Sequence, residues 1–116
     1  MTWTEVTGTS QSMAVNNGYI ANNAALVTFT LPATASVGDI IAVSGSGAGG
    51  WKIAQNASQK IIWNAGGTAG VNETTTGTGG HIDSSGRYDV IYLQCIVTDT
   101  TWKVLSYKTV DGFDLT

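Results

Sequence analysis

Three residues with the side chains of a hydrolytic triad stand close together in the C-terminal half of the chain: His81, Asp83 and Ser84. In such a triad the histidine takes the proton of the serine hydroxyl, and the aspartate orients the histidine. The side chains must converge in space, and residues crowded into one strand and turn cannot easily do so. The chain has one histidine, so no other triad can be built from it. We expect a polar loop histidine and a protein that is not an enzyme.

A glycine pattern of the kind that binds dinucleotides occurs at Gly45, Gly47 and Gly50. A dinucleotide site needs a helix that begins at the glycines and an acidic residue about 20 positions later. Residues 51–55 alternate like a strand, and residues 65–70 contain no Asp or Glu. The glycines therefore favour a tight reversal between two strands, residues 39–44 and 51–55, and we expect no cofactor.

Metal ligands are also few in this chain. One cysteine, Cys95, and one histidine cannot build a zinc site, and a single cysteine rules out an intrachain disulfide. The aspartates are not spaced as a calcium-binding loop, although a calcium ion held between loops stays open. Cys95 lies within the apolar run 91–97, where we expect a buried, unreactive thiol.

Four tryptophans suggest a different kind of chemistry, the stacking of sugars on exposed indole rings. Trp63, which precedes Asn64, and Trp3, near the N-terminus, are the best candidates for glycan stacking. For Trp63 a place in the core or an interface is the alternative. Trp51 and Trp102 lie in alternating segments, and we expect both in the core.

The composition limits the classes of function. The chain has 116 residues, enough for one domain, and charged residues make up 11% of it, against roughly 25% in ordinary soluble domains. Its five cationic residues are scattered singly and the net charge is −3, so we expect no nucleic-acid partner. We find neither a signal peptide nor an apolar stretch of membrane-spanning length. Export within a virion would need no signal peptide.

The elements that must position these residues are strands. Val27, Phe29 and Leu31 alternate with threonines, and no window keeps apolar residues at helical spacing. Asn16, Asn17 and Gly18 suggest a hairpin turn. We expect a polar Gly/Thr-rich loop at 65–80, a short edge element at 81–86, and a turn at 98–101. The expected strands are residues 11–15, 18–22, 25–31, 39–44, 51–55, 60–64, 87–97 and 102–107.

This strand pattern predicts an all-β fold in which residues 1–116 form a single domain, an antiparallel β-sandwich of jelly-roll-like form. Residues 1–15 would be an N-terminal arm or an edge strand.

The strand at 87–97 is apolar on both faces, although a sandwich strand needs only one apolar face. Ile91, Leu93, Cys95 and Val97 share one face; Val90, Tyr92 and Ile96 share the other. Leaving the second face wet would cost roughly 1.5–3 kcal/mol per side chain. We expect Val90, Tyr92 and Ile96 to form an oligomer interface, with a covering loop as the alternative.

Nearly the whole chain, residues 16–110, resembles a module of phage virion proteins such as tail fibres, which also occurs in some bacterial surface proteins. The resemblance implies a homotrimeric, β-rich surface module without catalytic residues. Such modules usually end longer proteins, whereas this chain begins with Met1, which favours a stand-alone component such as a capsid decoration protein, or else a fragment. The matching segments are 18–20 with 22–23, 31–39 (LPATASVGD), 49–56 (GGWKIAQN), 76–80 (TGTGG) and 88–102.

Two functions follow as expectations. The first is a phage structural protein of the virion, a capsid decoration (cement) protein or a fibre tip, whose partners are copies of itself and other virion proteins. The alternative is a carbohydrate-binding module that attaches to surface glycans of a host.

Overall fold

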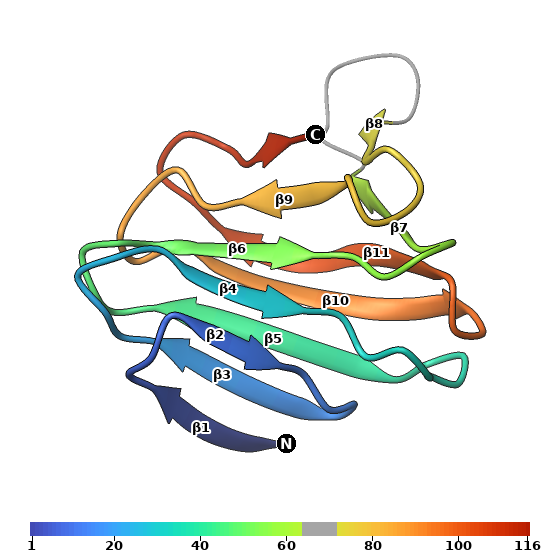
Figure 1. The fold of residues 1–116 in the computed structure, drawn as a ribbon, viewed down its shortest axis with the longest axis horizontal. Coiled ribbons are helices and arrows are strands. Elements are labelled where there is room, and N and C mark those ends of the chain that lie inside the picture. The colour runs from blue at the N-terminus through green and yellow to red at the C-terminus, as the bar shows by residue number, and fades with distance from the viewer. Residues whose placement is uncertain (64–71) are drawn as a thin grey trace.

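The computed structural model describes residues 1–63 and 72–116, which form twelve strands in two mixed sheets and no helix (Figure 1). The all-β prediction is therefore confirmed. The seven-stranded sheet contains, in spatial order, β1 (Thr2–Val6), β3 (Asn17–Ala21), β5 (Ile40–Gly45), β10 (Val90–Val97), β11 (Thr101–Lys108), β7 (Lys60–Trp63) and β8 (Asn72–Glu73). The five-stranded sheet contains β12 (Asp114–Leu115), β9 (His81–Asp83), β6 (Trp51–Ala54), β4 (Val27–Thr30) and β2 (Ser10–Ser12).

The first six strands alternate between the two sheets, so that the chain runs as a coil (Figure 1). β1, β3 and β5 pair in parallel in one sheet, and β2, β4 and β6 pair in parallel in the other. β7 and β11 are also parallel. The prediction of an antiparallel sandwich is wrong for these strands. Residues 1–15 supply β1 and β2, each of which is the outermost strand of its sheet.

The predicted hairpin at Asn16, Asn17 and Gly18 is also wrong, because the strands on either side of it belong to different sheets. Asn16 has a φ of 61°, and it turns the chain from β2 into β3. Its side-chain oxygen accepts a hydrogen bond from the N–H of Ile40, and its backbone N–H donates to the Ile40 carbonyl at 2.7 Å. The turn residue was recognisable from its type, but its pairing partner lies 24 residues away.

The glycine-rich segment 45–50 crosses from β5 to β6, between the sheets, and is not the expected tight reversal. It lies directly on the preceding crossing: the N–H of Gly47 donates to the Ala21 carbonyl, and that of Gly49 to the Asn23 carbonyl. A Cβ on Gly47 would stand 2.3 Å from the Asn23 backbone nitrogen. Glycine is needed here because two backbones touch, and no helix begins at these residues.

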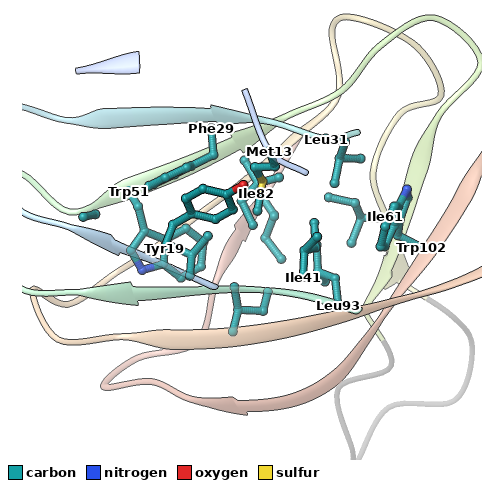
Figure 2. Packing of buried hydrophobic residues seen from close by; sticks show 14 of the residues in the cluster. Met13, Tyr19, Phe29, Leu31, Ile41, Trp51, Ile61, Ile82, Leu93 and Trp102 are labelled. Carbon is teal, nitrogen blue, oxygen red and sulfur yellow. The ribbon is translucent and has the colours of Figure 1, made fainter. Parts of the chain in front are cut away.

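One hydrophobic core fills the space between the sheets (Figure 2). Val27 and Phe29 of β4 and Trp51 and Ile53 of β6 are fully buried, as their two-residue alternation predicts. From the seven-stranded sheet, alternate residues of β10 enter the same core together with Trp102. These side chains are Ile91, Leu93 and Cys95.

Buried amides fasten the end of the coil opposite the glycine crossing. The Gln55 side-chain amide donates to the carbonyls of Gln59, Thr75 and Gly77 at 2.8–2.9 Å. Its oxygen accepts from the hydroxyl of Thr74, which is itself buried. Residues 74–77 of the predicted Gly/Thr-rich loop are thus hydrogen-bonded to a buried side chain. Residues 64–71 of that loop lie outside the described residues.

The last strands complete both sheets. β10 and β11 form an antiparallel hairpin, with Asp99 at a φ of 63° in the turn. β9 lies between β6 and β12, so the expectation of an edge element there is wrong: the C-terminal residues 114–115 add a strand outside it.

Candidate functional site

The side of the seven-stranded sheet that faces away from the core is called the outer face. Because side chains alternate along a strand, Val90, Tyr92 and Ile96 point to this face, while Ile91, Leu93 and Cys95 fill the core. Val97 was expected on the core face, but it is 51% exposed, because the register shifts between Cys95 and Val97. All three are half-buried in the single chain. The apolar residues of the outer face include Trp3, Ile20, Ile40, Ile62, Val90, Tyr92 and Ile96.

Trp3 of β1 covers part of this face. Its indole lies over Gly18, where a Cβ would approach the ring to 2.6 Å, and it meets the Tyr92 ring edge-on with centroids 6.3 Å apart. Ala42, which pairs with Gly18 on one side and Tyr92 on the other, is only 1% exposed. Trp3 itself remains 40% exposed. The chain's own N-terminal strand therefore partly covers Tyr92, one of the three residues that a second subunit was expected to cover.

The corresponding side of the five-stranded sheet, called the polar face, has a different character. Its strands are short, and its outward side chains carry hydroxyls and charges. They include Ser10, Thr28, Thr30, Lys52, His81 and Asp83. The two sides of the molecule thus differ: one presents partly exposed apolar side chains, the other polar ones.

His81 and Asp83 lie side by side on the polar face, with Nδ1 of His81 2.9 Å from Oδ1 of Asp83. The Ser84 hydroxyl points elsewhere and accepts a hydrogen bond from the backbone N–H of Trp51 at 3.0 Å. Two of the three triad residue types are therefore in contact, and the third is used to hold β6.

Trp63 is 8% exposed and packs against Tyr107 and Phe113, with ring centroids 4.6 and 4.8 Å away. It borders a hollow of about 460 Å³ that is also lined by Asn72 and Glu73. Trp63 therefore occupies a core position, which was the alternative to glycan stacking, and it also borders a concave surface. Glycan stacking on Trp63 or Trp3 stays a prediction.

Asp89 is a buried carboxylate that sequence reasoning missed. It is 1% exposed, and its oxygens accept hydrogen bonds from the backbone N–H groups of Ser85, Gly86 and Val110 and from the Thr109 hydroxyl. Burial raises the pKa of Asp89, but these hydrogen bonds together outweigh it and hold the pKa below its ordinary value. The only local signal is an aspartate shortly after a Ser-Gly turn, and its partners at 109–110 are 20 residues away.

Asp89 and its partners are structural. The carboxylate ties the turn before β10 to the segment that follows β11, and all of its contacts are internal. Its backbone carbonyl accepts the indole N–H of Trp51 at 2.9 Å. The residue therefore links both sheets at one end of the core.

Other chemistry-bearing groups stand apart. Cys95 is buried, and that burial raises the pKa of its thiol. Among residues 1–63 and 72–116, no three His, Cys, Asp or Glu side chains gather as a metal site. Over the same residues, no helix is long and apolar enough to cross a membrane.

Comparison with known proteins leaves the function to be argued from the chain itself. No protein-family model matches the sequence, and none of the curated proteins matches it either.

Proposed function

We propose that this protein is a non-enzymatic structural component of a virion surface that associates with copies of itself through the outer face. The observation that carries the proposal is the apolar character of that face. Val90, Tyr92 and Ile96 are only half-buried in the single chain, although Trp3 packs against Tyr92. Covering partly exposed apolar side chains with a partner lowers the free energy by roughly 25 cal/mol for each Å² removed from water.

The remaining features agree with a structural role. His81 and Asp83 contact each other, but neither is hydrogen-bonded to the Ser84 hydroxyl. The Asp89 carboxylate is occupied by hydrogen bonds within the chain. Scattered cations on an acidic chain favour protein partners over nucleic acid. A capsid decoration protein or fibre tip, with a homotrimeric jelly-roll-like form, is the specific assembly that the resemblance of the sequence suggests. Its other partners would be neighbouring virion proteins.

The experiment is light scattering of the purified chain over a concentration series, together with mass spectrometry of phage particles whose genome encodes it. We expect an oligomer in solution and the chain in purified particles. Tyr92→Lys should shift the protein toward monomer, because it places a charge within the apolar face. Thr28→Lys, on the polar face, is the matched control and should leave the mass unchanged. A strict monomer that is missing from the particles would contradict the proposal.

Glycan binding is a second candidate, favoured by the hollow that Trp63 lines together with Asn72 and Glu73. Sugar sites combine a stacking ring with directional hydrogen-bonding groups in this way. A glycan array separates the two functions. Binding that is lost in Trp63→Ala or Trp3→Ala would support attachment to surface glycans, and binding that ignores both substitutions would remove this candidate.

A further inference from the structure

One cross-strand row of the outer face has a charge at each end and apolar side chains between. Glu5 of β1 pairs with Ile20 of β3, which pairs with Ser44 of β5. Ser44 pairs with Val90 of β10, which pairs with Lys108 of β11. The row therefore runs acidic, apolar, small polar, apolar, basic, and β5 is its midpoint.

The two charges cannot satisfy each other within one chain. Four strand spacings separate Glu5 from Lys108, about 19 Å at ~4.8 Å per strand, more than twice the screening length of about 8 Å at physiological salt. Both residues are exposed. Within the described residues the ion pairs are Lys60 with Glu73 and His81 with Asp83, and neither Glu5 nor Lys108 takes part in one.

We propose that the outer face packs against the outer face of a second copy about a two-fold axis parallel to β5. Such an axis exchanges the two ends of the row, so Glu5 meets the partner's Lys108 and Lys108 meets the partner's Glu5. It also brings Ile20 against the partner's Val90. A two-fold contact uses the same patch on both copies, and a row that is complementary to its own reversal meets that requirement.

The shape of the face permits this contact. A twisted sheet is saddle-shaped, and a two-fold rotation about one of its strands, here β5, maps the saddle onto itself, so the gap between the two faces stays even. In the next row along, Trp3 and Tyr92 lie on either side of Ala42, also at β5. The Trp3 indole lies over Gly18 of β3, one strand from the axis, and so falls within the central part of the contact, where aromatic side chains contribute most to binding.

This inference rests on the self-association proposed above, but it replaces the homotrimer that the resemblance of the sequence implies with a two-fold dimer. Charge reversal tests it. Glu5→Lys alone and Lys108→Glu alone each create two like-charged pairs per dimer, whereas the double variant restores two opposite-charged pairs in reversed order. We expect each single variant to raise the dimer dissociation constant roughly tenfold or more, measured by sedimentation equilibrium. We expect the double variant to return to within about threefold of the unmodified protein.

Lys52→Glu is the matched control, because it makes the same charge change on the polar face and should leave the dissociation constant unchanged. Circular dichroism and thermal unfolding of every variant establish that each is folded. An additional variant, Glu5→Cys with Lys108→Cys, should form disulfide-linked dimers under mild oxidation, whereas either single substitution should not.

The outcomes separate this inference from the proposed function. An oligomer that ignores both single reversals, or one that the double variant weakens further, overturns the two-fold geometry and leaves self-association standing. A trimer that responds to the reversals also overturns the two-fold axis, since a head-to-tail contact would then join Glu5 to Lys108. A protein that stays monomeric at every concentration overturns both.

Discussion

Replacing Asp89 with asparagine tests how much the hydrogen bonds of this buried carboxylate stabilise the folded protein. The carboxylate oxygen Oδ2 accepts from the N–H groups of Ser85 and Gly86 at 2.9 and 3.0 Å and from the Thr109 hydroxyl at 2.8 Å. Oδ1 accepts from the N–H of Val110 at 3.1 Å. An asparagine of the same shape can present one oxygen only. Its NH₂ group must then face at least one backbone N–H, which is left without an acceptor.

The expected cost follows from these contacts. A hydrogen bond to a charged group contributes about 1.5–3 kcal/mol, and a buried donor without a partner costs about 1–3 kcal/mol. Since most of the shape and some of the bonds survive in Asp89→Asn, we expect the free energy of unfolding at pH 7 to fall by about 2–4 kcal/mol. For a chain of this length the midpoint of thermal unfolding should fall by roughly 8–16 °C.

The dependence on pH has a definite sign. The pKa of Asp89 lies below its ordinary value in the folded protein, while the unfolded chain titrates near about 3.9. Its stabilising contribution is therefore fully present above the unfolded pKa and is lost as the pH falls through the folded one. The difference in unfolding free energy between the unmodified protein and Asp89→Asn should be constant from neutral to mildly acidic pH and should narrow below about pH 4.

Denaturant unfolding followed by tryptophan fluorescence, at neutral and at acidic pH, measures both effects. Asp111→Asn is the matched control, because Asp111 is exposed and nearby, and its unfolding free energy should change by less than about 0.5 kcal/mol. Equal stability of Asp89→Asn and the unmodified protein would refute the reasoning. So would a difference that persists unchanged into acid.

Two further predictions concern backbone packing and the buried thiol. Gly47→Ala should lower the unfolding free energy by about 1–3 kcal/mol, because the new Cβ would meet the Asn23 backbone at 2.3 Å. Gly8→Ala is the control and should not lower it, because the space around Gly8 is open. Equal losses in the two variants would contradict the direct backbone contact between segment 45–50 and Asn23. Cys95 should not react with a thiol reagent at neutral pH until the protein is unfolded, because it is fully buried and burial raises its pKa. Rapid reaction of the folded protein would contradict its placement in the core.

Part of the candidate site could be predicted from the sequence, because it depends only on the alternation of neighbouring residues along one strand. The alternation of β10 put Val90, Tyr92 and Ile96 on the face opposite Ile91 and Leu93, and the structure has them there. That the N-terminal Trp3 would lie over Tyr92 was out of reach, since the contact depends on β1 joining the sheet and on Gly18 leaving room for the ring. The same holds for Asp89, whose partners at 109–110 come from beyond the next hairpin.

The sequence by itself determined that the chain forms strands and which side chains enter the core, as with Phe29 and Trp51, because the two-residue period of a strand acts between near neighbours. Only the tertiary structure decided which sheet each strand joins and in which direction it pairs. The parallel coil of β1 to β6 arises from backbone contacts between segments 15 to 24 residues apart, such as Thr2 with Asn17 and Gly18 with Ala42. Alternation is the same in parallel and antiparallel strands, so it carries no information about such partners.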